Sequence, residues 1–414
     1  MPSHSRPVVL RRPVLLAACL SVALGTVGYL AFDPAAASAS VAKEPIPASA
    51  ARTGAGGANT AQVVKAANAF LATLSDEQKD TVLYDFDDEV KTTGWSNFPT
   101  PVVERNGLKL GDLTAEQDAA AMKVMEAALS EQGYEELVEI RKADDYLASL
   151  SDTDDGSSAS PAAPATPTDT PTATATPTRT PPSGAPTGGT GGGPGGGGGG
   201  GGANFGSEWY YLSFFGTPSR TGEFTVQYGG HHAAYNITYA GDNVTMSPSL
   251  TAVEPEEFAW EGTQYAPLAD KRAATIGAVQ SLTADELAAA EIDGSFDDLF
   301  LGPGNDGPFP TDPEGVLVSS LTRKQQAKVT AMLRTWVDDL DEKAAARLLK
   351  KYVSEYDETY IGWSGGTTID NDQTYVRLDG PSAWIEFSNQ AGASTDEIHQ
   401  HTIFRDETSD YGWE

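Results

Sequence analysis

The fold of this 414-residue chain is decided in residues 223–250, which read EFTVQYGGHHAAYNITYAGDNVTMSPSL. β-Branched and aromatic residues alternate with polar ones over 223–228 and 232–239, as expected for strands with one buried face. The sequence Ala240-Gly241-Asp242-Asn243 follows, and Gly, Asp and Asn are typical of tight hairpin turns. This stretch therefore predicts antiparallel strands joined by short turns.

Further strands and helices follow from the same kind of periodicity. Short alternating runs predict strands over 209–215, 244–250, 359–363, 374–378, 383–387 and 398–404. Apolar residues at helical spacing predict helices over 61–73, 76–84, 115–129, 131–149, 284–290, 323–338 and 341–355. Because helices and strands occupy separate stretches, we expect an α+β fold with an antiparallel sheet and a helical N-terminal part packed on it.

Four of these helices begin with one motif, a leucine followed by Ser or Thr and, three residues later, Glu or Gln. The motifs start at Leu74, Leu113, Leu282 and Leu321. The hydroxyl caps the helix amides, the Glu or Gln side chain reaches back, and the leucine packs on the first turn. The flanking sequences do not align, so we interpret the motifs as common capping chemistry and expect no internal repeat.

The N-terminal region has the layout of an export signal. Basic residues precede an apolar run over 14–32 and a small-residue stretch, which is typical of a secretory leader. Residues 1–42 are therefore predicted to be a signal peptide or, because the apolar run is long enough to cross a bilayer, an N-terminal membrane anchor. We expect an extracellular or cell-surface protein that meets a membrane only through this segment.

Composition excludes several classes of function. The chain has 58 Asp and Glu against 27 Lys and Arg, so nucleic acid is a poor partner. Its single cysteine, Cys19, lies in the leader, which excludes disulfides and cysteine chemistry from the mature protein. No phosphate-binding loop motif occurs in the sequence. The Asp/Gly-rich run 293–307 does not fit an EF-hand, so a solvated loop is expected there.

Histidine is the residue type whose placement indicates a site. Outside the leader it occurs only as two close pairs, His231-His232 and His399-Gln400-His401. Alternate residues of a strand share a face, so His399 and His401 can both reach one ion. Adjacent residues leave opposite faces, so only His232 should join them unless Gly229-Gly230 bends the strand.

We therefore predict that His232, His399 and His401 bind a divalent metal such as zinc, copper or iron. The alternative is a network of hydrogen-bonded histidines without metal. His231 and Asn236 are predicted to contact a cofactor or ligand.

The predicted catalytic residues are Glu386, Arg405 and Asp406, which follow or flank the histidine strand. Each has a structural alternative. Arg405 can instead form an ion pair with Asp410 that closes the C-terminal turn. For Glu386, which lies between apolar residues of a strand, we favour a pair with Arg377 or Arg405.

In combination the motifs resemble a bacterial and fungal family known as domain of unknown function 3500. The motifs that carry the resemblance are Gly229-Gly230-His231-His232, Pro381-x-x-Trp384-Ile385-Glu386, His399-x-His401-x-Ile403-x-Arg405-Asp406, Leu74-Ser75-x-x-Gln78 and Leu113-Thr114-x-Glu116-Gln117. In that family the segments matching 60–150 and 205–414 are continuous. The resemblance implies that the Pro/Thr/Gly-rich stretch 151–204 is a disordered insertion into one domain, between a helical part and an α+β part with the histidines.

The expected function is a metal-dependent hydrolase that acts on a small-molecule substrate after export. The alternative is a non-catalytic cell-surface protein that binds a ligand or associates with the envelope. In that case the histidines are structural or bind the ligand directly. The family resemblance favours neither, because the family has no assigned activity.

Overall fold

The computed structural model describes residues 58–100, 102–154, 204–305 and 307–413. The predicted leader and most of the Pro/Thr/Gly-rich stretch lie outside these ranges. The helices are α1 (Thr60–Leu71), α2 (Asp76–Val82), α3 (Val90–Thr93), α4 (Ala115–Ala128), α5 (Glu131–Asp154), α6 (Ala269–Val279), α7 (Ala284–Ala290), α8 (Arg323–Val337) and α9 (Glu342–Val353). Short 3₁₀ turns occur at η1 (Leu110–Asp112), η2 (Ser207–Trp209) and η3 (Val318–Ser320).

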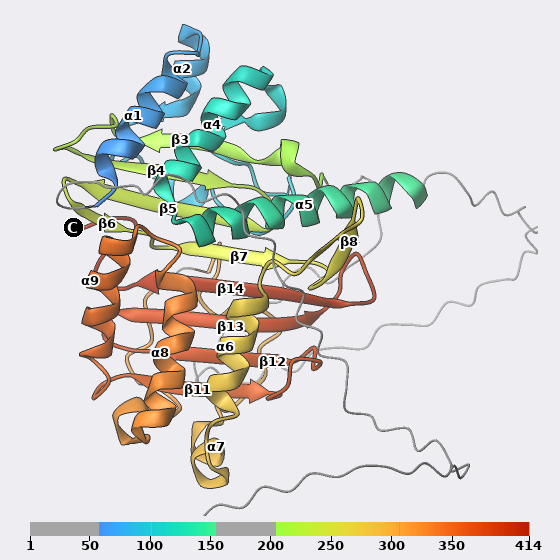
Figure 1. Ribbon diagram of the computed structural model, residues 1–414, viewed down its shortest axis with the longest axis vertical. Helices are drawn as coiled ribbons and strands as arrows, with labels where there is room; N and C mark the ends of the chain where they lie inside the picture. The colour runs from blue at the N-terminus through green and yellow to red at the C-terminus, as the bar shows by residue number, and fades with distance from the viewer. Residues whose placement is uncertain (1–57, 101, 155–203, 306, 414) are drawn as a thin grey trace, which may run out of the picture. The chain divides into compact units, whose positions relative to one another are not determined.

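Twelve of the described strands form one sheet (Figure 1). The strands are β1 (Leu83–Tyr84), β2 (Leu108–Lys109), β3 (Tyr211–Phe215), β4 (Glu223–Gly229), β5 (Ala233–Ala240), β6 (Asn243–Thr245), β7 (Ser249–Val253), β10 (Val316–Leu317), β11 (Tyr360–Gly365), β12 (Thr374–Asp379), β13 (Ala383–Ala391) and β14 (Ile398–Asp406). Their order is β1-β3-β4-β5-β7-β14-β13-β12-β11-β10, with β2 on β3 and β6 on β5. A separate hairpin is formed by β8 (Phe258–Trp260) and β9 (Thr263–Tyr265). Only β1 and β3 pair in parallel, so the predicted α+β class with an antiparallel sheet is confirmed.

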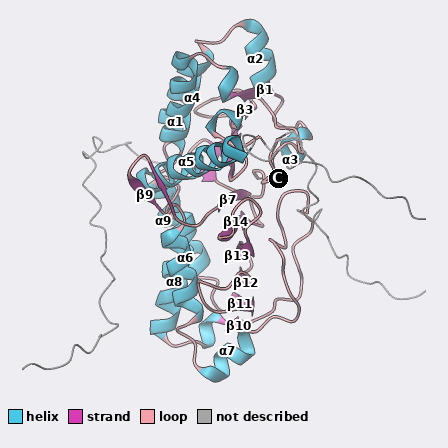
Figure 2. Cartoon of the chain, turned by 90° about the vertical axis from the view of Figure 1, so that its right-hand side faces the viewer, coloured by secondary structure: helices cyan, strands magenta, loops and turns pink. Residues whose placement is uncertain are grey.

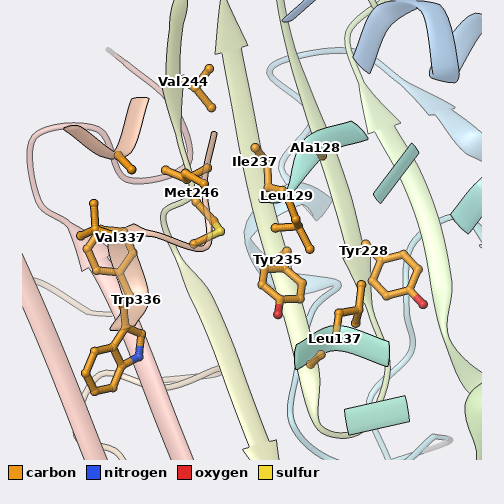
Figure 3. Packing of buried hydrophobic residues seen from close by; sticks show 14 of the residues in the cluster. Ala128, Leu129, Leu137, Tyr228, Tyr235, Ile237, Val244, Met246, Trp336 and Val337 are labelled. Carbon is orange, nitrogen blue, oxygen red and sulfur yellow. The ribbon is translucent and has the colours of Figure 1, made fainter. Parts of the chain in front are cut away.

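Most of the helices cover one face of the sheet, and the main hydrophobic core lies between these two layers (Figure 2). Figure 3 shows Leu129, which follows α4, and Leu137 of α5 beside Tyr235 and Ile237 of β5. Burial of each such side chain stabilises the fold by roughly 1.5–3 kcal/mol. None of the described helices is long and apolar enough to cross a membrane.

Loops cover the opposite face of the sheet (Figure 2). A second, smaller apolar cluster lies there, formed by Trp95, Ala234, Leu250, Ala252, Leu299 and Ile403. Side chains alternate along a strand, so Ile403 shares this face with His399 and His401 of β14. The histidine pair of β14 therefore lies under loops and not under the helix layer.

The two halves of the chain repeat one order of elements. Apart from α3, β6 and the β8-β9 hairpin, the first half runs α1, α2, β1, β2, α4, α5, β3, β4, β5, β7, and the second runs α6, α7, β10, α8, α9, β11, β12, β13, β14, with no strand in the place of β1. The last strands of the halves, β7 and β14, are antiparallel neighbours in the middle of the sheet. An approximate twofold axis normal to the sheet between β7 and β14 therefore relates the halves.

Backbone details of the halves agree closely. The register of β2 with β3 matches that of β10 with β11, and the register of β4 with β5 matches that of β12 with β13. Gly107 and Gly315 precede β2 and β10 with φ of 89° and 115°. A Cβ on Gly107 would lie 2.1 Å from Leu212 O, and a Cβ on Gly315 would lie 2.4 Å from Ile361 O, so both positions require glycine.

The capping motifs mark this duplication, and the expectation of no internal repeat is wrong. Gln117 Nε2 donates to Gln78 Oε1 at 3.0 Å and joins the caps of α4 and α2. Gln325 Nε2 donates to Glu286 Oε2 at 2.5 Å and joins the caps of α8 and α7 in the same way. The hydrogen bonds between the caps are thus kept in both halves although the sequences around them have diverged.

One predicted strand is divided in the structure, and the other predicted helices and strands are present with ends shifted by a few residues. Residues 244–250 do not form one strand, because β6 and β7 are separated around Pro248, which cannot donate to a sheet ladder. Helix α6 was not predicted. Its buried face includes Lys271 and Arg272, so charged residues interrupt the apolar pattern.

Candidate metal centre

His231 and His232 form the two-residue loop of the hairpin between β4 and β5. Gly230 N donates to Ala233 O across this loop at 2.8 Å. A Cβ on Gly230 would lie 2.6 Å from the Tyr210 ring, so the tight approach requires glycine. The predicted strand over 232–239 starts one residue too early, and the prediction that the two histidines face apart is wrong. Their rings lie against each other with centroids 3.6 Å apart.

Strand pairing brings His232 next to the histidines of β14. Ala252 of β7 donates its N–H to His232 O at 2.7 Å, and Ala252 is paired with His401 on its other side. Because the alanine side chain is small, imidazoles from both sides of β7 can meet over it. His399 Nε2 lies 3.1 Å from His232 Nε2 and 2.9 Å from His401 Nε2.

Behind His232 and His399 lie two buried carboxylates. Asp144 Oδ1 of α5 is 2.7 Å from His232 Nδ1, and Glu254 Oε2 is 3.5 Å from His399 Nδ1. Asp144 is fully buried and Glu254 is 1 % exposed. Within the described ranges, their only ion-pair partners are histidines. Burying an ionised carboxylate without a charged partner is costly, so a positive charge at this cluster would stabilise it.

The third carboxylate, Asp298, reaches His401 from the loop that follows α7. Its Oδ1 lies 2.6 Å from His401 Nδ1 and accepts a hydrogen bond from Gln390 Nε2 at 2.8 Å. The same loop is held by Glu386, whose Oε1 accepts from Leu301 N at 2.9 Å. Each ring that contributes an Nε2 to the cluster thus has a carboxylate oxygen within 3.5 Å of its Nδ1, and the oxygen that faces His401 is within hydrogen-bond distance at 2.6 Å.

The surroundings keep two of the histidines uncharged. Burial, together with the neighbouring His401 and His232, holds the pKa of His399 well below its ordinary value. Burial and His232 lower the pKa of His231 to about 4. Where a neutral ring carries its proton on Nδ1, toward a carboxylate, its Nε2 holds a lone pair. Facing lone pairs repel each other unless a cation lies between them or one ring carries its proton on Nε2 and donates it to the next ring.

Buried His and Asp groups at this place could hold a metal ion. The Nε2 separations of 3.1 and 2.9 Å are close to the roughly 3.3 Å between two nitrogens that each lie about 2.0 Å from a tetrahedral ion. A second group of three potential ligands consists of Asp144, His231 and His232. His232 belongs to both groups, through Nε2 in the first and Nδ1 in the second.

Two other predicted site residues have partners elsewhere in the fold. Asn236 Oδ1 accepts from Gln227 Nε2 at 2.7 Å, and its Nδ2 donates to Pro248 O at 3.0 Å. Asp406 Oδ2 accepts from Tyr352 OH at 2.6 Å, on the side of the helix layer. These contacts hold strands and helices together.

The favoured pairing of Glu386 with an arginine is wrong. Glu386 accepts hydrogen bonds from Trp384 Nε1 at 2.6 Å, from Tyr375 OH at 2.8 Å and from two loop amides. Arg377, which lies opposite it in the sheet, pairs with Glu314 at 2.9 Å. The neutral donors satisfy the carboxylate without a cation.

Arg405 forms an ion pair with Asp410, which was the structural alternative to its predicted catalytic role. Arg405 Nε also donates to Asp410 Oδ1 at 3.3 Å, so two guanidinium nitrogens contact this carboxylate. The pair ties β14 to the C-terminal turn.

Asp144, Glu254 and Asp298 were missed as site residues. The helical periodicity of the sequence could have identified Asp144, because it lies on the buried face of α5 with Ile140 and Leu147. Asp298 lies within the Asp/Gly-rich run that the sequence predicts to be a loop, and loop composition does not indicate which carboxylate turns inward. Glu254 directly follows β7, where no periodicity marks it.

The fold and site define a duplicated α+β protein with a buried cluster of histidines and carboxylates. The family model described as protein of unknown function (DUF3500) matches residues 56–413, and the chain belongs to this family. Comparisons with curated proteins and with solved structures find no match.

Proposed function

We propose that this protein is a metal-dependent hydrolase of small substrates, with one divalent transition metal bound by the Nε2 atoms of His232, His399 and His401. The observation that supports this most strongly is the convergence of three imidazoles, each with a carboxylate behind it. Zinc, copper and iron are the ions that such a ligand set suits. Three protein ligands leave a coordination position for water or substrate, as in catalytic sites.

Charge supports the same proposal. Asp144 and Glu254 are buried with histidines as their ion-pair partners in the described part of the chain, and Asp298 adds a third carboxylate. A divalent ion among the three rings supplies the positive charge that these groups lack. The bound metal would polarise a substrate carbonyl or lower the pKa of a bound water.

The residues around the ligands act by holding them. Glu254 Oε1 accepts from Ser394 N at 2.6 Å and Thr395 N at 2.8 Å, which fixes its other oxygen beside His399. The side chain of Asp298 is 41 % exposed, whereas those of His232 and His399 are 0 % and 9 % exposed. A small substrate would therefore approach the cluster from the side of Asp298.

The alternative function is a non-catalytic ligand-binding or envelope-associated protein at the cell surface. It is favoured by the roles of Glu386 and Arg405, which hold loops in place. In both proposals the protein is exported, which the basic and apolar pattern of residues 1–42 supports.

Elemental analysis of protein purified without an affinity tag tests the metal. We expect bound metal in the wild type and its loss in the His399→Ala/His401→Ala variant. Ser382→Ala, in the hairpin that corresponds to His231-His232 in the second half, is the matched control and should keep the metal. A wild type that takes up no zinc, copper or iron, with unchanged stability in the double variant, would overturn the metal-dependent proposal and leave the alternative.

A further inference from the structure

We propose a second cation site formed by His231 Nδ1, His232 Nδ1 and Asp144 Oδ1, so that the His232 ring bridges two divalent metal ions. This inference rests on the proposed function, because the bridging ring also contributes Nε2 to the three-histidine centre. The ligands are imidazole nitrogens and one carboxylate oxygen, which suit zinc or copper.

The first support is that all three candidate atoms are buried without a hydrogen bond. Asp144 Oδ1 lies 2.7 Å from His232 Nδ1 and 3.4 Å from His231 Nδ1, but neither contact has the direction of a hydrogen bond. Buried polar atoms are nearly always hydrogen-bonded, and an ion is one of the explanations for those that are not. Three such atoms at one point indicate a shared partner.

The second support is that the neighbouring contacts orient these atoms. Asp144 Oδ2 accepts from Tyr210 OH at 2.7 Å, which leaves Oδ1 turned toward the histidines. The His231 ring is held between the His232 ring and Phe205, whose centroid lies 4.9 Å away. The positions of the three ligand atoms are therefore fixed by these neighbouring contacts and not by contacts of the ligand atoms with one another.

The third support is the balance of charge. Asp144, Glu254 and Asp298 bring three negative charges to the cluster. When a second ion binds Nδ1 of His232, the ring proton passes to solvent and the ring becomes an imidazolate with one further negative charge. Two divalent ions then balance the four negative charges, whereas with a single ion the His232 ring stays neutral and one of the three carboxylate charges is uncompensated.

The duplicated half shows that the fold itself does not need these ligands. The corresponding hairpin has Pro381-Ser382 in place of His231-His232, and Glu355 takes the place of Asp144. There Ser382 Oγ donates to Glu355 Oε1 at 2.8 Å, an ordinary hydrogen bond that closes the hairpin onto the end of α9. In the first half, the corresponding residues His231, His232 and Asp144 form no hydrogen bond of this kind through the candidate ligand atoms. These atoms are therefore free to bind an ion.

The ratio of metal to protein tests this proposal. The full chain is saturated with Zn²⁺, freed of excess ion and analysed for metal, and we expect two ions per chain. His231→Phe keeps an aromatic ring beside Phe205 but removes the nitrogen, and Asp144→Asn weakens the carboxylate ligand, so each should bind one ion. Glu355→Gln and Ser382→Ala are matched controls in the second half and should keep two.

A spectroscopic measurement separates loss of a ligand from damage to the fold. With Cu²⁺ at both sites, an imidazolate bridge couples the spins, so the wild type should show a weakened paramagnetic signal that His231→Phe restores to one isolated Cu²⁺. Two ions in the wild type and one in His231→Phe support the bridge. One ion in both, lost in His399→Ala/His401→Ala, would overturn the second site and keep the three-histidine centre. No ion in the wild type would overturn both.

Discussion

The imidazoles of the three-histidine centre are held by contacts of different kinds. His232 is placed by its backbone, which accepts from Ala252 N at 2.7 Å, and His401 is placed by Asp298 at 2.6 Å. His399 lies between them, with Nε2 atoms 3.1 and 2.9 Å away. Asp298 lies in a loop, so its side chain can be replaced without moving the strand that carries His401.

Asp298→Asn should therefore weaken metal binding without unfolding the protein. Replacing a carboxylate that supports a metal-bound histidine typically lowers metal affinity about 10–100-fold. Competition with a chromophoric chelator measures this change. The exposed neighbour Asp297→Asn serves as the control and should bind as the wild type does. Equal affinity of the two variants would show that Asp298 does not support the site.

At this scale the sequence predicts the histidines better than their surroundings. The spacing of His399 and His401 is enough to place both on one face of a strand, and the structure places them there. The arrangement of His231 and His232 was mispredicted, because a two-residue hairpin loop does not alternate as a strand does. The partners of the rings come from distant segments, which one sequence without structure does not bring together.

At the scale of elements, helix α6 carries the most consequential side chain outside the histidine site. Lys271 is 1 % exposed and forms ion pairs with Glu136 of α5 and with Asp339, the latter at 2.8 Å. Burial raises the pKa of Glu136 to about 8, against the opposing effect of Lys271. The lysine thus keeps two buried carboxylates of neighbouring elements from facing each other uncompensated.

Lys271→Met should lower the free energy of unfolding by about 3–5 kcal/mol, because it leaves the buried carboxylates without a cation. Denaturant unfolding followed by circular dichroism measures the change. Lys328→Met, on the exposed side of α8, is the matched control and should change stability by less than about 0.5 kcal/mol. A Lys271→Met variant as stable as this control would refute the role of the lysine.

Elements with strong local signals were predictable, and those that depend on tertiary contacts were not. The capping motifs fixed the starts of α2, α4, α7 and α8, because cap hydrogen bonds are local. Helix α6 escaped prediction because its buried charges are satisfied only by residues of other elements. The hydrogen bonds between caps, which reveal the duplication, are likewise tertiary.

At the scale of the whole molecule, the histidine site combines the two halves of the duplication. The first half contributes His232, and the second contributes His399 and His401, where β7 and β14 meet. The helices of 60–154 pack on strands that follow the Pro/Thr/Gly-rich stretch. Asp144 of α5 faces His232 from the segment before that stretch, so the site is complete only when the segments on both sides stay together.

Proteolytic cleavage within 160–200 should leave the two resulting fragments associated. The buried core that joins α1, α4 and α5 to the sheet is formed by described residues on both sides of this stretch, and these contacts are expected to hold the nicked fragments together. Size-exclusion chromatography of the nicked protein, followed by gel electrophoresis, measures the association. Elution of the fragments at separate volumes would contradict a single domain with an insertion.

The central claim, a metal bound by the three histidines, is tested most directly by anomalous X-ray scattering from crystals grown with Zn²⁺ or Cu²⁺. Data collected on both sides of the metal absorption edge locate the ion. We predict a peak about 2.0–2.1 Å from the Nε2 atoms of His232, His399 and His401. Saturating metal with no peak among these three nitrogens would contradict the account.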